Sequence, residues 1–213
     1  MTGFSPALVS TAAAVTVTQL NEAGTAYGAE ELRAIGAVAK QRGLKLHMDG
    51  ARFANAAAFR DCAPAAISCA AGVDTLAFGF VKNGGMGAEA LVFFDPALAD
   101  AARFRRKRGG HLQSKGRFLA AQILTLVEDG LWLENARAAN DAAREIADAA
   151  EGRLLHPVES NQLFLTATPA ERAALRAQGF GFYDWGGDAA RIVTAWSSNS
   201  GHVAAFARAI AAL

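Results

Sequence analysis

Two hydrophobic runs decide how this chain folds: Leu46-His47-Met48-Asp49-Gly50-Ala51-Arg52 and Phe78-Gly79-Phe80-Val81-Lys82-Asn83-Gly84. Each run reads as a strand that stops abruptly, and a lone charged residue stands at its exit, Asp49 in the first and Lys82 in the second. The carboxyl ends of neighbouring strands are where α/β sheets carry their chemistry. An unpaired charge is costly away from water, so we expect a buried carboxylate and a buried amine that serve one site.

A pyridoxal phosphate site accounts for this pair of residues. The lysine would form a Schiff base with the cofactor's aldehyde, and the aspartate would pair with the protonated pyridine nitrogen. Position leaves simpler alternatives open for both. Lys82 could reach solvent from a strand end, as most lysines do, and Asp49 could be the N-cap of a helix that begins at Ala51.

The first hundred residues alternate between strand and helix patterns. We predict strands over residues 15–20, 45–48, 74–81 and 90–94. We predict helices over residues 28–43, 51–59 and 64–71, and from residue 96 onward. This order indicates an α/β fold with a mainly parallel sheet.

The second half of the chain has a different pattern. Residues 114–150 are helical with an interruption near Gly130, and helices are also predicted over residues 169–178 and 201–213. Strands are predicted over residues 153–158, 162–167, 179–185 and 191–196. We therefore expect a large domain with its connecting helix over residues 1–140, and a small α+β domain with an antiparallel sheet over residues 141–213.

Composition limits the possible partners. The chain has 21 Lys and Arg against 20 Asp and Glu, which gives no reason to expect nucleic acid or an anionic membrane. Every apolar run is broken by a charge well short of a membrane span, and the opening residues lack the basic start of a signal peptide. Cys62, Cys69 and the scattered histidines have no metal-ligand spacing. We expect a cytoplasmic protein with no metal and two reduced cysteines in its core.

Two longer motifs carry a resemblance to a known family. His47 to Ala54, HMDGARFA, and Phe78 to Glu89, FGFVKNGGMGAE, resemble the signature stretches of the low-specificity L-threonine aldolases, in the group that includes the aromatic amino-acid β-eliminating lyases. The likeness extends to Arg191-Ile192-Val193-Thr194. It implies a fold type I enzyme that uses pyridoxal 5'-phosphate, acts on a small amino acid, and assembles as a homodimer or homotetramer.

The resemblance also assigns roles to individual residues. It implies that Lys82 is the catalytic lysine that binds the cofactor and that Asp49 is the pyridinium partner. Arg52 is implied to lie beside cofactor and substrate, and Arg191 to hold the substrate carboxylate, although spacing favours a surface arginine for each. Lys107 and Lys115 are further candidates for the phosphate, with a solvated helix face as the alternative. Val81 stands where the family often has a hydroxyl residue.

The resemblance predicts cleavage of L-threonine, L-allo-threonine and related β-hydroxy-α-amino acids to glycine and an aldehyde. Family members carry a substantial N-terminal portion before the point that matches the start of this chain, so we expect the C-terminal part of such an enzyme. Two alternatives remain: an inactive remnant of the family, or a related β-eliminating lyase that uses the same Lys82 and Asp49.

Overall fold

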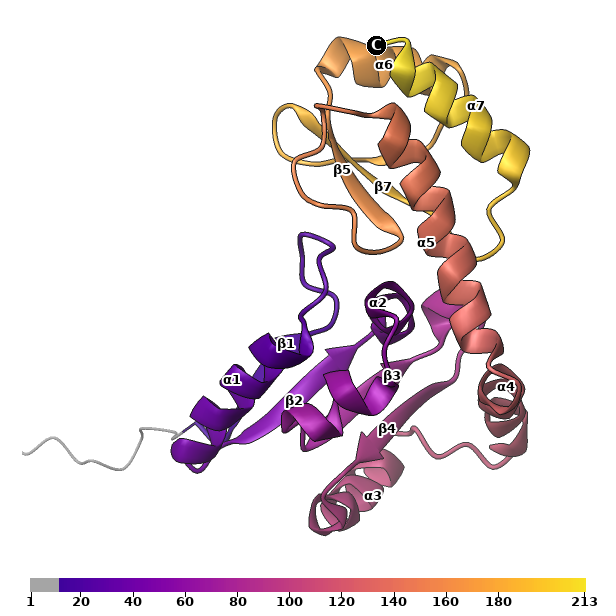
Figure 1. The fold of residues 1–213 in the computed structure, drawn as a ribbon. Coiled ribbons are helices and arrows are strands. Elements are labelled where there is room, and N and C mark those ends of the chain that lie inside the picture. The colour runs from indigo at the N-terminus through magenta and orange to yellow at the C-terminus, as the bar shows by residue number, and fades with distance from the viewer. Residues whose placement is uncertain (1–11) are drawn as a thin grey trace, which may run out of the picture.

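The structure is a computed structural model, and it describes residues 12–213. The expectation about a signal peptide falls largely on residues 1–11, which lie outside this range. Two sheets organise the chain, joined by one long helix (Figure 1). Within the described range, no helix combines the length and the apolar character needed to cross a membrane.

The first sheet is the mainly parallel one that the sequence predicts. Its strands, in spatial order, are β1 (Ala14–Thr18), β2 (Lys45–Gly50), β3 (Thr75–Gly79) and β4 (Glu89–Phe93). The first three are parallel, whereas β4 runs antiparallel to β3. Parallel strands need crossover connections. Helix α1 (Ala29–Gln41) connects β1 to β2. Helix α2 (Phe53–Arg60) and the 3-10 turns Pro64–Ile67 and Cys69–Ala71 connect β2 to β3.

The helices that follow β4 lead to the second sheet. They are α3 (Ala99–Arg108), α4 (Arg117–Glu128) and α5 (Leu131–Ala149). Gly130, with φ +75°, interrupts the helical run as predicted. Helix α5 packs on α2 at one end and on α7 (Ser200–Ala211) at the other. The predicted domain boundary near residue 140 stays a prediction, and it falls inside α5.

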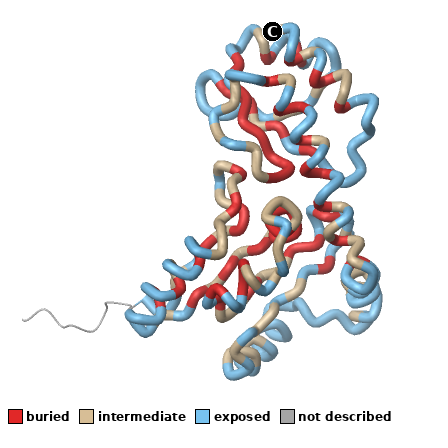
Figure 2. Tube along the Cα trace, in the orientation of Figure 1, coloured by how far each residue is buried: buried red, intermediate tan, exposed pale blue. Residues whose placement is uncertain are grey.

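The second sheet is antiparallel, in agreement with the sequence. Its order is β5 (Gln162–Thr166), β7 (Ala189–Val193) and β6 (Tyr183–Asp184), with α6 (Pro169–Ala177) and α7 beside it. Each sheet has its own hydrophobic cluster, the first around Leu46 and Met48, the second around Leu163 and Leu165. Figure 2 shows this buried interior in both sheets, with α3 and α4 largely exposed.

Some local predictions were wrong, each for a visible reason. Residues 153–158 form a single bridge at Leu154 and no strand, because Pro157 cannot donate to a ladder. Residues 64–71 are two 3-10 turns and no α-helix, since Ser68 between them leaves the helical region at φ −142° and ψ −108°. Only Tyr183–Asp184 of residues 179–185 is a strand, because Gly179 turns the chain with φ +92°.

The two cysteines differ from their predicted setting. Both are free thiols in the structure. Cys62 is half-buried, and Cys69 is exposed at the start of a 3-10 turn. The expectation that both belong to the core is therefore wrong, because the helix that would have buried Cys69 does not form.

Candidate active site

One small cavity collects the residues that the sequence singles out. It has a volume of about 140 Å³ and lies where the carboxyl ends of β1 and β2 face the second sheet. Its lining consists of Thr18, Gln19, Leu20, Asn21, Glu22, Asp49, Ala51, Arg52, Lys82, Gln162 and Arg191. All four predicted site residues, Asp49, Arg52, Lys82 and Arg191, are in this set although they come from three separate segments of the chain.

Asp49 reaches the cavity from the last residues of β2. It pairs in register with Thr18 of β1 and with Ala77 of β3, so the strand holds its backbone on both sides. Its Oδ1 accepts a hydrogen bond of 3.0 Å from the backbone N–H of Ala51. Asp49 does not cap a helix, because α2 begins at Phe53 with Arg52 in the N-cap position. The carboxylate is therefore fixed in direction by the turn that follows its strand.

Lys82 reaches the same cavity from beyond the end of β3. The strand ends at Gly79, and Lys82 lies in the 3-10 turn Val81–Asn83. The Asn83 side chain anchors this turn by donating a 2.7 Å bond to the carbonyl of Trp132 in α5. Lys82 is exposed and Asp49 is half-buried. The expectation of a buried amine is therefore wrong, and that of a buried carboxylate holds only in part, because both residues face a cavity that solvent reaches.

A close backbone approach brings the two strand ends together. A Cβ added to Gly79 would lie 2.7 Å from the Cα of Ala51, and one added to Gly50 would lie 2.8 Å from the carbonyl oxygen of Ala77. Only glycine fits at such distances. The end of β3 is therefore in direct contact with the chain that leaves β2, and the parallel strands place Asp49 and Lys82 at the same edge of the sheet.

Arg52, at the start of α2, and Arg191, on β7, both bring positive charge to the cavity. Burial lowers the pKa of the Arg52 guanidinium below its ordinary value, and the positive charge of Arg191 lowers that pKa further, while Glu22 opposes both effects. The guanidinium stays protonated near neutral pH, because its ordinary pKa lies far above that range. The Nε of Arg52 is buried and has no hydrogen-bond partner among the described residues. Such a donor favours an acceptor group from a ligand.

The charges that line the cavity do not cancel. Its cationic side chains are Lys82, Arg52 and Arg191, and its carboxylates are Asp49 and Glu22. The excess of positive charge attracts anions, and a partly enclosed site strengthens the attraction. A ligand that carries carboxylate or phosphate groups fits this balance.

Sequence reasoning missed Gln162 and Gln19 in this site. Gln162 is buried in β5 and accepts hydrogen bonds from the guanidinium of Arg191. Gln19 is fully buried, and its amide exchanges two hydrogen bonds with the backbone of Tyr27, which closes the loop after β1. Neither residue carries a signal in the sequence, since an amide at a strand end reads as an ordinary edge position. Lys107 and Lys115 are exposed and are not among the residues that line the cavity.

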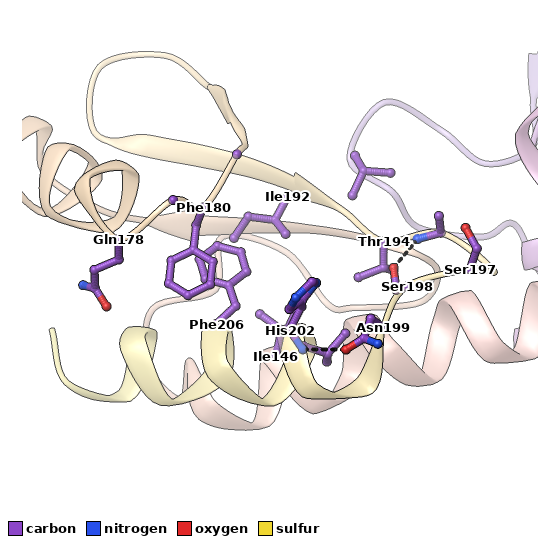
Figure 3. Close-up of a pocket in the computed structure, with 15 residues that line it drawn as sticks. Ile146, Gln178, Phe180, Ile192, Thr194, Ser197, Ser198, Asn199, His202 and Phe206 are labelled. Carbon is purple, nitrogen blue, oxygen red and sulfur yellow. Dashed lines mark hydrogen bonds between the residues drawn. The ribbon is translucent and has the colours of Figure 1, made fainter.

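A larger hollow of about 630 Å³ lies in the C-terminal part between β7 and α7 (Figure 3). Its floor is apolar, with Phe180 and Phe206 stacked at 4.5 Å. Two of the polar side chains at its rim serve the local fold, because Asn199 caps α7 by accepting from the N–H of His202 and Ser198 accepts from the N–H of Ala195. The candidate active site is therefore the smaller, charged cavity.

The mainly parallel sheet with its antiparallel edge strand, together with the small antiparallel sheet, has the architecture of the pyridoxal-phosphate enzymes of fold type I. The chain belongs to the β-eliminating lyase family, whose model matches residues 8–168. Members of this family and the threonine aldolases depend on pyridoxal phosphate. The fold class predicted from the sequence is confirmed.

Individual relatives agree with this assignment. The chain is 43% identical over 204 residues to the low specificity L-threonine aldolase of Pseudomonas sp. (strain NCIMB 10558), covering 93% of this chain and 59% of that protein. It is 45% identical over 201 residues to the enzyme of the same name from Pseudomonas aeruginosa, covering 92% and 58%. The solved threonine aldolase of Leishmania major superposes with a TM-score of 0.84 at 31% identity, covering 92% and 59%. The resemblance to threonine aldolases is confirmed, and the chain spans about 59% of the length of these relatives.

Proposed function

We propose that this chain carries the site of a pyridoxal-phosphate-dependent aldolase. The reaction is cleavage of L-threonine, L-allo-threonine and related β-hydroxy-α-amino acids to glycine and an aldehyde. The observation that carries the proposal is the convergence of Lys82, Asp49, Arg52 and Arg191 on one cavity. The relatives at 43% and 45% identity, both named low specificity L-threonine aldolases, support the substrate class.

The residues of the cavity fit the cofactor in three respects. They offer an exposed amine, a carboxylate fixed at a strand end, and a buried guanidinium Nε in need of an acceptor. The positive excess suits a ligand with an anionic phosphate. When bound, pyridoxal phosphate supplies a ring that withdraws electrons from the α-carbon and so stabilises the charge left there when the Cα–Cβ bond breaks.

Each of the four predicted site residues has a distinct role in this proposal. The Nζ of Lys82 would hold the cofactor through its aldehyde group. The Asp49 carboxylate would face the ring nitrogen of the cofactor and favour its protonated form. Arg52 would donate hydrogen bonds to an acceptor group of the cofactor or substrate. Arg191 would bind the substrate carboxylate through its planar guanidinium. Arg52 and Arg191 together would fix the orientation of the substrate and of the bond to be broken. A fixed orientation lowers the barrier because the reacting groups lose less freedom on the way to the transition state.

The test is the visible spectrum of the 213-residue chain with added pyridoxal phosphate. We expect an absorption band that disappears in Lys82→Ala, and borohydride reduction should place the label on the peptide that contains Lys82. Lys40→Ala is the matched control, because Lys40 is an exposed lysine of α1 and should leave the band unchanged. A band that persists in Lys82→Ala would contradict the assignment.

The family description favours one second candidate, a β-eliminating lyase that uses the same Lys82 and Asp49 on another side chain. Product analysis separates the two reactions. An aldolase converts threonine to glycine and acetaldehyde in equal amounts, whereas an eliminating lyase forms no glycine. A chain that binds the cofactor and forms neither set of products would instead be a remnant that has kept the cofactor site without the activity.

We further infer a homodimer or homotetramer in the cytoplasm. The support is a set of large apolar side chains left exposed on α3 and α4, with exposed fractions of 73% for Phe104, 62% for Phe118 and 60% for Leu124. Phe118 and Leu124 lie on the same helix, α4, and a contiguous exposed apolar surface marks an interaction site. Light scattering of the purified chain should give a mass above the 22.2 kDa of one chain, and Leu124→Glu should lower that mass.

A further inference from the structure

We propose that Gln162 is a positioning residue, one that aims the guanidinium of Arg191 into the cavity and leaves its charge free for a ligand carboxylate. This inference rests on the proposed function for the identity of that ligand. Arg191 donates to the Oε1 of Gln162 through its Nε at 3.2 Å and also through its Nη2. Two donors on one acceptor fix the plane of the guanidinium as well as its position.

The strand register explains why these side chains meet. Gln162 pairs with Val193 and Phe164 pairs with Arg191, so Gln162 and Arg191 are diagonal neighbours across β5 and β7. Residues two apart share a face of a sheet, and long side chains bridge a diagonal. Leu163 and Ile192, the intervening residues, point the other way into the second hydrophobic cluster. The two polar side chains therefore share the face turned toward the cavity.

The loop after β1 holds Gln162 in place from the other sheet. A Cβ added to Gly24 would lie only 3.2 Å from the Cβ of Gln162, which places the loop backbone directly against this side chain. The hydroxyl of Ser160 donates to the carbonyl of Gly24 at 2.9 Å and accepts from the N–H of Gln162 at 3.2 Å. Gln162 is thus fixed relative to the segment that leads into the first sheet.

The acceptor for Arg191 is neutral, and this sets Arg191 apart from Arg153, Arg172 and Arg176 in the same part of the chain. Arg153 pairs with Glu171, and Arg172 and Arg176 both pair with Asp184. Among residues 12–213, Arg191 has no carboxylate within ion-pair distance. A neutral amide orients the guanidinium without cancelling its charge, so the positive excess of the cavity is preserved for an anionic ligand.

The first test needs no cofactor. The exchange of the Arg191 Nε–H with solvent is followed by NMR in the 213-residue chain, with the signal assigned through Arg191→Lys. We expect slow exchange in the parent and in Gln162→Glu, which keeps the acceptor, and exchange roughly tenfold faster in Gln162→Leu, which removes it. Equal exchange in all three would overturn the proposal. Thermal unfolding of each variant establishes that the chains compared are folded.

The second test measures what the neutral amide does for a ligand. The parent and both variants are titrated, with pyridoxal phosphate present, with glycine and with glycinamide, which lacks the carboxylate. We expect glycine affinity to fall roughly tenfold in Gln162→Leu and by up to about 100-fold in Gln162→Glu, where the new carboxylate competes for the fork, with glycinamide unchanged. Glycine binding by Gln162→Glu that equals the parent's would overturn the charge argument.

The two tests keep this inference separate from the proposed function. If the parent binds no glycine while Gln162→Leu loses the slow exchange, then the proposed function fails and the positioning of Arg191 stands. If the parent binds glycine and Gln162→Leu weakens glycine and glycinamide equally, then Gln162 supports the fold and does not position Arg191.

Discussion

In the first sheet the site residues lie where strands end, whereas in the second sheet they lie along one face of two strands. Asp49 and Lys82 follow hydrophobic runs that stop abruptly, one at the end of β2 and one in the turn beyond β3. Gln162 and Arg191 occupy diagonal positions on β5 and β7, beside apolar residues that point into the second cluster. In a parallel sheet the site residues lie at the carboxyl ends of the strands, because the loops gather there. In an antiparallel sheet they can lie along the face that is not packed on the core.

The difference also separates the chemistry of the two parts. In the proposed function, the first sheet carries the residues that handle the cofactor, and the second carries those that recognise the carboxylate. Helix α5 and the contact between Ser160 and Gly24 hold the two sets in one cavity. Further support comes from Asn55 of α2 and Asn140 of α5, which are buried and exchange two hydrogen bonds. Changes in one sheet should therefore affect one function and spare the other.

The largest expected effect comes from a cavity made in the hydrophobic cluster of the second sheet. Leu165→Ala removes a fully buried side chain from β5 and should lower the free energy of unfolding of the C-terminal part by about 2–5 kcal/mol. Carboxylate recognition should weaken while the cofactor band that depends on Lys82 persists. Chemical denaturation and the visible spectrum measure the two effects. Leu155→Ala, at a leucine that is 47% exposed, is the control. Loss of the band as well would show that the two sheets do not act separately.

Asp49→Asn changes the part of the site that belongs to the first sheet and leaves the second sheet as it is. The amide keeps an acceptor for the N–H of Ala51 and removes the charge. We expect the rate of threonine cleavage to fall on the order of 10²-fold, because the ring nitrogen loses its ionic partner. The difference in affinity between glycine and glycinamide should stay as in the parent. Asp61→Asn, at an exposed residue, should leave the rate unchanged. A rate unaffected by Asp49→Asn would argue against the proposed role.

Gly79→Ala tests the close approach of the two strand ends. The added Cβ would lie 2.7 Å from the Cα of Ala51, so the strands must separate. Overpacking of this kind costs about 1–3 kcal/mol of stability, and cofactor binding should weaken with it. Gly87→Ala is the matched control, because nothing lies within 4 Å of its added Cβ. Equal melting temperatures for the two variants would contradict this account.

The smallest effect concerns acid stability in the second part. The pKa of Glu171 lies below its ordinary value of 4.5, chiefly because its carboxylate accepts from the N–H of Thr168, with further contributions from Arg153 and the Thr168 hydroxyl. A lowered pKa in the folded state means that the stabilisation is present above pH 4.5 and is lost as the pH falls through the folded value. Glu171→Gln should therefore flatten the acid dependence of unfolding below pH 4.5. Glu151→Gln, at an exposed residue, should leave that dependence as it is.

The sequence by itself determined the fold class and the residues at the strand ends. Hydrophobic runs that stop at a single charge are a local signal, and they identified Asp49 and Lys82 without any knowledge of packing. The family motifs added Arg52 and Arg191. The same local reasoning failed at residues 153–158 and at residues 64–71, where a proline and a serine altered the backbone.

Only the tertiary structure decided how these residues meet and how exposed they are. Burial depends on what packs against a strand end, so the sequence could not show that Asp49 and Lys82 face an open cavity. The hydrogen bonds between Gln162 and Arg191, which are 29 residues apart, depend on the register of β5 and β7. They also depend on Gly24 in a distant loop, which packs against Gln162. Contacts of that kind are set by long-range packing, and they leave no pattern along the chain.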